Sequence, residues 1–299
     1  MAVSVHRAAV VGKPIAHSLS PVIHNAGYAA AGLTGWSYTR IECAAAELPG
    51  LVAGLGPEWA GLSVTMPGKE AALAVAAEVS PVAAAVGAAN TLVRRPDGSW
   101  YADNTDVSGM VEVLTEAGVR PGATVTVLGA GGTARAALAA AARLHASAVA
   151  VVARRPAAVA ELAPVADILG LAMTAAPWSE ASTLLNADVV ISTVPKGAAD
   201  DLAGAVPKGA ADEFADTVPK GAADEFAGTV RWRPGTVLFD AIYDPWPTPL
   251  AASAGAAGCR IVSGLDLLLA QAIGQFEQFT GVAAPRAAMS AALAAARAG

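Results

Sequence analysis

The feature that most constrains the fold is a short glycine turn near the middle of the chain. An apolar run typical of a buried strand, 124–128, leads into Gly129-Ala130-Gly131-Gly132-Thr133-Ala134, and an alanine-rich run typical of a helix, 134–144, follows. Glycines in such a turn permit a tight bend and close approach of the backbone to a pyrophosphate, and the helix N-terminus offers free N–H groups. The turn predicts a dinucleotide site. The alternative is a plain strand-to-helix turn without a ligand.

Strands and helices alternate on both sides of this turn. We expect strands at 8–12, 37–42, 61–65, 148–152, 188–194 and 236–241, helices at 21–31, 68–79, 107–117 and from 266 onward, and a hairpin of 90–94 with 99–102. A chain of 299 residues is long enough for two domains. The pattern predicts an α/β protein with an N-terminal α/β substrate domain, 1–106, completed by C-terminal helices in 264–299. A Rossmann-type dinucleotide domain, 107–263, would follow it.

Composition excludes several classes of partner. The chain has 19 Lys plus Arg against 25 Asp plus Glu and a pI near 5.2, so we expect no nucleic-acid partner. Alanine raises the mean hydropathy to +0.49, but the uncharged stretches are short and interrupted, which argues against a membrane span. Cys43 and Cys259 lie too far apart in sequence for a disulfide framework or a zinc cluster, so we expect no metal, reduced thiols and a cytoplasmic location.

A tandem repeat interrupts the second half of the chain. Residues 194–205, 206–217 and 218–229 are three copies of one 12-residue unit, and the second and third differ only at Asp216 and Gly228. Pro and Gly in each copy limit any helix to one or two turns, so each copy has little to bury. We expect a solvated excursion in the dinucleotide domain. A functional lid is the alternative, because the repeat follows the carboxyl end of a predicted strand.

Several polar residues occupy positions that suit chemistry. Lys69 is expected to begin a helix, where the macrodipole disfavours a cation, and Asp106 precedes another helix. Ser18 and Ser20 place two hydroxyls on one side of an extended stretch before a helix that has Pro21 in its first turn. Each has a simpler interpretation: a solvated lysine for Lys69, an N-cap for Asp106 or Ser20, and a loop polar group for Ser18.

The cofactor preference is suggested by the end of the strand at 148–152. NAD-specific sites place an acid there, whereas this chain has Ala153-Arg154-Arg155. Arginine pairs with a 2′-phosphate, so the pattern favours NADP. The alternative is an ordinary exposed arginine pair.

Taken in order, these motifs resemble the shikimate dehydrogenase family over essentially the whole chain apart from the extra repeats. The resemblance is carried by Gly12-Lys13-Pro14, Ser18-Leu19-Ser20-Pro21, His24-Asn25, Val64-Thr65-Met66-Pro67 with Lys69, Gly87-Ala88-Ala89-Asn90-Thr91-Leu92, Asn104-Thr105-Asp106, Tyr243-Asp244-Pro245 with Thr248 and Leu250, and Gly264 with Gln271. The family usually has Asn-Arg-Thr where this chain has Ala153-Arg154-Arg155.

The resemblance implies roles for individual residues. Lys69 and Asp106 would be catalytic, and the substrate would be bound by Ser18, Ser20, Thr65, Asn90, Tyr243 and Gln271. The glycine turn 129–134, Arg154, Arg155 and Gly264 would bind the cofactor. The implied activity is NADPH-dependent reduction of 3-dehydroshikimate to shikimate in chorismate and aromatic amino acid biosynthesis, by a monomer or homodimer. The alternatives are a quinate or quinate/shikimate dehydrogenase that uses NAD or NADP, and a non-catalytic nucleotide-binding regulatory module.

Overall fold

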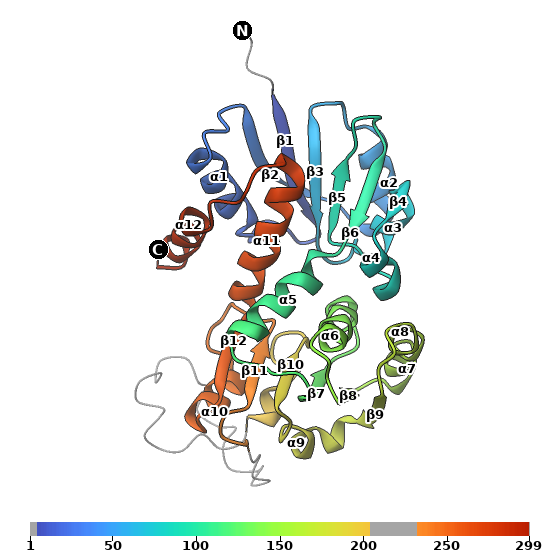
Figure 1. Cartoon of the computed structure of the whole chain (residues 1–299), viewed down its shortest axis with the longest axis vertical. Helices are drawn as coiled ribbons and strands as arrows, with labels where there is room; N and C mark the ends of the chain where they lie inside the picture. Colours follow the sequence, from blue (N-terminus) through green and yellow to red (C-terminus); the bar gives the residue numbers. More distant parts are fainter. Residues whose placement is uncertain (1–4, 204–231, 299) are drawn as a thin grey trace. The chain divides into compact units, whose positions relative to one another are not determined.

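The computed structural model describes residues 5–203 and 232–298 (Figure 1). The chain forms two compact units: Met1–Met110 with Leu268–Gly299, and Val111–Leu267. Each unit is an α/β structure built on one six-stranded sheet, so the α/β fold class is confirmed. Two helices, α5 (Thr105–Glu116) and α11 (Gly264–Thr280), contain the points where the chain passes from one unit to the other.

The sheet of the first unit is mixed, in the order β2-β1-β3-β5-β6-β4. Its strands are β1 (His6–Gly12), β2 (Trp36–Glu42), β3 (Trp59–Val64), β4 (Glu78–Val79), β5 (Thr91–Arg94) and β6 (Trp100–Asp103). The first three strands are parallel, whereas β5 runs antiparallel to both β3 and β6. The predicted hairpin is confirmed: Gly98 has a φ of +86°, and Ser99 donates from its N–H and hydroxyl to Asp97 Oδ1.

Short helices and a C-terminal helix pair complete this unit. They are α1 (Ser20–Ala30), the 3₁₀ turn η1 (Ala45–Glu47), α2 (Leu48–Ala53), α3 (Ala71–Val75), α4 (Pro81–Val86), the greater part of α11, and α12 (Arg286–Ala298). Helix α12 packs against α1. Buried apolar side chains such as Leu62, Leu92 and Trp100 form the core on one face of the sheet.

The single helix predicted at 68–79 is wrong. Only Ala71–Val75 is helical, and Glu78–Val79 instead forms strand β4, which pairs in parallel with Tyr101 and Ala102 of β6. Alanine-rich composition favours a helix locally, but the Ala77 N–H donates to the carbonyl of Trp100, which diverts the chain onto the sheet edge. Lys69 therefore lies in a turn before α3.

The sheet of the second unit is entirely parallel, in the order β12-β11-β10-β7-β8-β9. Its strands are β7 (Thr124–Leu128), β8 (Ala148–Ala153), β9 (Met173–Pro177), β10 (Val189–Ser192), β11 (Val237–Asp240) and β12 (Arg260–Ser263). Read from β9 to β12, the order is that of the doubly wound dinucleotide-binding fold, which reverses direction between β7 and β10.

The helices of this unit are α6 (Gly132–Arg143), α7 (Pro156–Ala160), α8 (Ala163–Ile168), α9 (Ala181–Leu184) and α10 (Pro249–Ala256), with 3₁₀ turns η2 (Trp178–Glu180) and η3 (Asp200–Leu202). Thr248 caps α10 by accepting from the Ala251 N–H at 3.1 Å, and its own hydroxyl donates to Asp240 Oδ2 at 2.6 Å. Within the described ranges, no helix combines the length and apolar character needed to cross a membrane.

The first copy of the tandem repeat corrects one expectation. Ala199, Leu202 and Ala203 are buried, and the first two pack in a core cluster with Trp232 and Leu128, so this copy does bury apolar surface. Its only helical segment among the described residues is the 3₁₀ turn η3, which is within the limit of one or two turns expected for each copy. The second and third copies, 206–229, lie outside the described residues.

Candidate active site

Sheet topology gathers the polar motifs of the first unit at one edge. Because β5 is antiparallel to its neighbours, the beginning of β5 lies beside the carboxyl ends of β3 and β6, as the pairing of Thr91 with Ser63 and with Asp103 shows. Thr65, Asn90 and the segment 104–106 continue from these three strand ends. Residues far apart in sequence therefore lie together at the end of the sheet where β3 and β6 finish and β5 begins.

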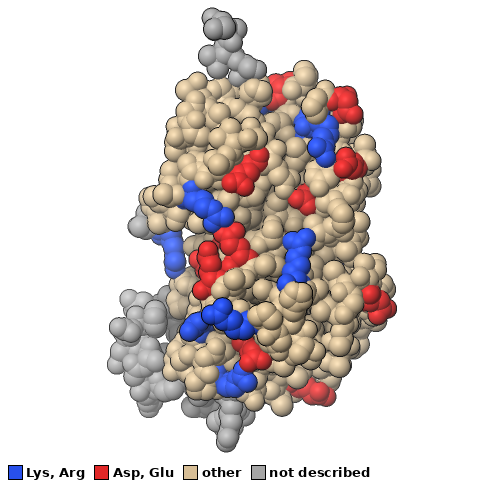
Figure 2. Space-filling view, in the orientation of Figure 1, with Lys and Arg blue, Asp and Glu red and all other residues tan. Residues whose placement is uncertain are grey.

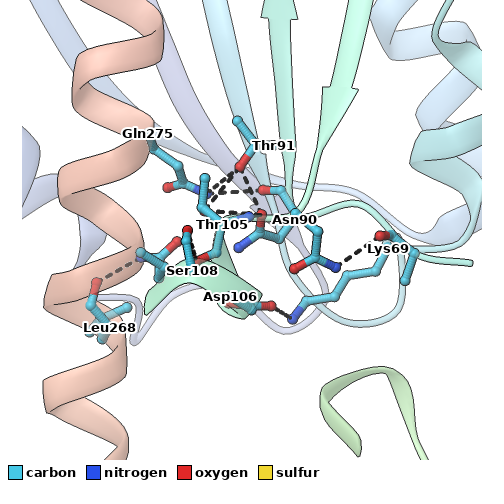
Figure 3. Close-up of polar contacts among 11 residues, drawn as sticks. Lys69, Asn90, Thr91, Thr105, Asp106, Ser108, Leu268 and Gln275 are labelled. Atoms are coloured by element: carbon cyan, nitrogen blue, oxygen red, sulfur yellow. Dashed lines mark hydrogen bonds and ion pairs between the residues drawn. The ribbon is translucent and has the colours of Figure 1, made fainter. Parts of the chain in front are cut away.

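Lys69 and Asp106 form a direct ion pair at this edge. Lys69 Nζ lies 2.5 Å from Asp106 Oδ2, and their side chains are 19% and 10% exposed (Figure 3). The Lys69 carbonyl accepts from the Ala89 N–H at 2.8 Å, which fixes the turn that carries the lysine. A solvated surface lysine is therefore the wrong interpretation. Asp106 lies inside the first turn of α5, so the N-cap interpretation is also wrong.

Asn90 is buried, and its side-chain oxygen is held by three donors. Oδ1 accepts from the Thr105 N–H at 2.8 Å, from the Thr105 hydroxyl at 3.1 Å and from the Thr91 hydroxyl at 2.7 Å. A backbone N–H can only donate, so the atom facing Thr105 must be the oxygen. Nδ2 is therefore the end of the amide left to donate to a ligand.

The serine pair lies at the start of α1. The predicted N-cap at Ser20 is wrong, because the helix begins at Ser20 itself, after Leu19, and no side chain caps it. The Ser20 N–H instead donates to Ser18 Oγ at 3.3 Å. Arg40 clamps this loop by donating from Nε and Nη2 to the Ser18 carbonyl at 2.9 and 2.5 Å. The Ser18 hydroxyl thus lies at the N-terminus of α1, where a carboxylate is favoured, whereas Ser20 is buried with its hydroxyl against that of Tyr38.

Thr65 and Gln271 occupy the remaining first-unit positions. Thr65 follows β3 and donates its N–H to the Val11 carbonyl at 2.9 Å. Its methyl group packs against Gly12, where an added Cβ would lie only 2.4 Å from Thr65 Cγ2. Gln271, in α11, donates from Nε2 to the Leu268 carbonyl of its own helix at 2.7 Å. Its amide nitrogen is therefore engaged within its own helix in this structure.

The glycine turn of the second unit occupies the point where the sheet order reverses. Gly129 follows β7 with a φ of +107°, and a Cβ there would lie 2.5 Å from Thr193 Oγ1, just beyond β10. Gly131 precedes α6 and has open space around it. Only glycine fits the first position, and the open space leaves room for a ligand at the helix N-terminus. This arrangement fits a pyrophosphate.

Arg154 and Arg155 follow β8, the strand next to β7. Arg154 is exposed, stacks over the Trp178 ring at 5.3 Å and donates to the Ala198 carbonyl. Trp178 Nε1 in turn donates to Asp201 Oδ2 at 3.0 Å. The first repeat copy thus contacts the side chains next to the predicted 2′-phosphate position. The interpretation as an exposed arginine pair stays open.

Tyr243 and Gly264 are also in the second unit. A Cβ at Gly264 would lie 2.1 Å from the Ala241 carbonyl oxygen and 3.2 Å from Tyr243 Cδ1. The close approach of backbone and ring explains a glycine at this position. Burial, with a smaller contribution from Asp244, raises the pKa of the Tyr243 phenol, so it remains a neutral hydrogen-bond donor at physiological pH.

Three residues next to these sites are absent from the sequence prediction. Ser63 and Gln275 are buried and bonded to each other beside Asn90, and Trp178 stacks on Arg154. Ser63 lies within a predicted strand and Gln275 within a predicted helix, so neither had a distinguishing local signal. The one cue that could have identified Gln275 is its spacing from Gln271 and Gln278, four residues before it and three after, which aligns three glutamines on one face of the predicted helix.

No metal centre is indicated in the described ranges: they contain no group of three or more His, Cys, Asp and Glu side chains that could hold an ion. Figure 2 shows charges of both signs scattered over a largely uncharged face.

The second unit has the fold and the glycine turn of dinucleotide-binding proteins. The first unit has a lysine–aspartate ion pair where its strands end. These features define a two-unit α/β protein with a dinucleotide-binding domain. The profile described as "Shikimate dehydrogenase substrate binding domain" matches residues 10–92, and "Shikimate 5'-dehydrogenase C-terminal domain" matches residues 264–294. The chain belongs to the shikimate dehydrogenase family, as its motifs predicted.

Relatives match over nearly the whole chain. The shikimate dehydrogenase (NADP(+)) of Anaeromyxobacter sp. (strain Fw109-5) is 39% identical over 96% of this chain and 95% of that protein. The crystal structure of Mycobacterium tuberculosis shikimate dehydrogenase is 46% identical, with a TM-score of 0.81 and coverage of 97% of this chain and 99% of the other. Shikimate 5-dehydrogenase from Thermus thermophilus, in complex with NADP(H) and shikimate, is 30% identical, with a TM-score of 0.77 and the same coverage of 97% and 99%.

Proposed function

We propose that this protein catalyses the reversible NADPH-dependent reduction of 3-dehydroshikimate to shikimate, a step toward chorismate and the aromatic amino acids. The observation that carries the proposal is the paired, largely buried Lys69 and Asp106 beside Asn90, in a chain of this family. The family membership supports the reaction, and the geometry supports the roles of these residues.

Lys69 supplies the proton in this proposal. When a carbonyl carbon accepts hydride, negative charge develops on its oxygen, and a nearby ammonium group stabilises that charge and donates a proton to form the hydroxyl. In the oxidative direction, Lys69 Nζ accepts the hydroxyl proton. The pair has little exposure to solvent, so the field of the ammonium group is weakly screened.

Asp106 and Asn90 position the reactants. Asp106 holds Lys69 Nζ at 2.5 Å and accepts from a substrate hydroxyl with its remaining lone pairs, and Asn90 Nδ2 donates to a substrate oxygen. Ser18 and Ser20 bind the carboxylate, and Thr65, Tyr243 and Gln271 supply further hydrogen bonds. The first unit is in this proposal the substrate domain, and the second the cofactor domain.

The second unit fits NADP. The Gly129 turn and the N-terminus of α6 would hold the pyrophosphate, and Arg154 and Arg155 would pair with the 2′-phosphate. When bound, NADPH supplies the hydride. Gly264 lies at the end of β12 in the same unit and is also proposed to contact the cofactor. A cytoplasmic location and a monomer or homodimer complete the proposal.

A steady-state assay tests the function by crossing shikimate and quinate with NADP and NAD. We expect the highest kcat/KM for shikimate with NADP. A higher kcat/KM for quinate, or for NAD, would favour a quinate or quinate/shikimate dehydrogenase, and no turnover of any pair would favour a non-catalytic nucleotide-binding module.

A further inference from the structure

A chain of buried hydrogen bonds runs from the interior of the first unit to Asn90. The Tyr38 hydroxyl donates to Ser63 Oγ at 2.5 Å, and the Ser63 hydroxyl donates to Gln275 Oε1 at 2.6 Å. All three side chains are buried, and Gln275 is fully so. A buried polar chain of this kind holds its members in one arrangement, because each unmade bond would leave a desolvated group unsatisfied.

The orientation of the Gln275 amide follows from its partners. Nε2 donates to the Asn90 carbonyl at 3.0 Å and to Thr91 Oγ1 at 3.1 Å (Figure 3). A carbonyl oxygen can only accept, so the amide nitrogen must face Asn90 and the amide oxygen must face Ser63. Reversing the amide would set two acceptors against each other at Asn90.

The Thr91 hydroxyl links the Gln275 amide to the side chain of Asn90 by hydrogen bonds. Because Thr91 Oγ1 accepts from Gln275, its own proton is available to Asn90 Oδ1, 2.7 Å away. Asn90 is therefore fixed twice by Gln275: directly at its backbone carbonyl and through Thr91 at its side-chain oxygen. The contact through Thr91 favours the side-chain orientation that leaves Nδ2 as the donor, as the Thr105 N–H also does. The contact at the backbone carbonyl fixes the position of the residue itself.

We infer that Gln275 is a positioning residue, which orients Asn90 so that its Nδ2 donates to a substrate oxygen. The inference rests on the proposed function, since Asn90 is a substrate-binding residue only there. Ser63 is a second positioning residue, because its hydroxyl donates to Gln275 Oε1 and so directs the amide nitrogen of Gln275 toward Asn90. Gln275 itself is not placed in contact with substrate.

Gln275→Met tests the role of the amide. Methionine has similar length and no hydrogen-bonding amide, and the Asn90 carbonyl keeps a second donor, the Val64 N–H at 2.7 Å. We expect KM for shikimate to rise about fivefold to tenfold, the equivalent of about one hydrogen bond, with kcat changed less than about threefold. KM for NADP should stay the same.

Gln278→Met is the matched control. Gln278 lies one turn further along α11 and donates to Asp103 Oδ2 at 2.7 Å, so its loss should lower the melting temperature without changing KM. In an Asn90→Ala background, Gln275→Met should raise KM no further, since the two residues act as one unit.

Wild-type turnover of shikimate is measured first, because its absence would overturn the proposed function and with it the inference. With turnover present, an unchanged KM in Gln275→Met, or an equal rise in the Gln278→Met control, would overturn the role of Gln275 alone. Should Gln275→Met not fold, Ser63→Ala decides: a rise in KM of about twofold to threefold supports the inference, and an unchanged KM overturns it.

Discussion

The Lys69 ammonium group has exchanged most of its hydration for the carboxylate of Asp106. In the proposed mechanism Lys69 acts on charge that develops during the reaction, whereas Asn90, Ser18 and Ser20 bind the ground state and the transition state alike. Substitution of Lys69 should therefore affect kcat, and loss of a substrate-binding side chain should affect KM.

Lys69→Ala should lower kcat about a hundredfold or more while leaving the dissociation constant of shikimate within a few-fold, because a positioned proton donor is lost. Steady-state kinetics and equilibrium binding of shikimate measure the two effects. Lys13→Ala is the control: Lys13 forms an exposed ion pair with Glu42 at 3.4 Å, so its loss should change kcat and stability little. A Lys69→Ala enzyme with near-normal kcat would remove Lys69 from the mechanism.

Arg154→Ala should weaken the binding of NADP about tenfold to a hundredfold and the binding of NAD much less, because only NADP carries the 2′-phosphate. Fluorescence titration of each cofactor measures the difference. Arg155→Ala and the double variant show whether the neighbouring guanidinium compensates. Trp178→Leu separates the stacking contact from the charge: it should weaken NADP by a smaller factor. Equal losses of NADP and NAD in Arg154→Ala would refute the assignment.

At the scale of elements, α1 is attached to the first sheet by an aromatic cluster centred on His24. The imidazole is fully buried and stacks on Tyr38 with ring centroids 4.1 Å apart. Burial lowers the pKa of His24 to about 3, and Gln275 offsets part of the effect. The unfolded chain therefore binds a proton below about pH 6.5 that the folded protein excludes.

This burial predicts acid sensitivity. Above about pH 6.5, His24 is neutral in both the folded and the unfolded protein and does not affect stability. As the pH decreases from about 6.5 toward 3, the free energy of unfolding should fall, and the decrease should be about 2 kcal/mol at pH 5. His24→Phe keeps an aromatic ring against Tyr38 and should remove that part of the pH dependence in urea titrations at about pH 5 and pH 7.5.

A second histidine provides the control for His24→Phe. His145 is exposed with a φ of +54°, which asparagine also tolerates, so His145→Asn should keep the acid sensitivity of the parent. Identical pH dependence in His24→Phe and the parent would show that His24 does not contribute.

Elements were predictable where local pattern and tertiary pairing agree. Strand β7 has the expected bounds, because its apolar run is enclosed by turn signals on both sides. The helix at 68–79 was wrong because the pairing of β4 with β6 depends on a strand more than 20 residues away. Gln275 was missed for the same reason: its partners are 184 and 212 residues distant in sequence.

At the scale of the whole molecule, the sequence motifs predicted the family and the α/β fold of both units. Motifs identify a family because they mark positions where chemistry or backbone geometry allows few residue types, such as Gly129 beside Thr193. They contain no information about which buried partners hold those residues. The tandem repeat is the largest feature that neither the fold nor the motifs require.

Deleting Val206–Thr229, the second and third copies, should preserve folding and turnover. The first copy supplies the buried Ala199, Leu202 and Ala203 and the carbonyl that accepts from Arg154, so the deletion leaves these contacts in place. Loop-closure entropy changes by only about 0.6 kcal/mol per doubling of loop length, so the melting temperature should stay the same or rise slightly. Leu202→Ser in the full chain is the opposite control, since it places a hydroxyl in the core and should lower the melting temperature. A several-fold rise in KM for NADP or fall in kcat on deletion, at unchanged melting temperature, would instead show that the extra copies act as a lid.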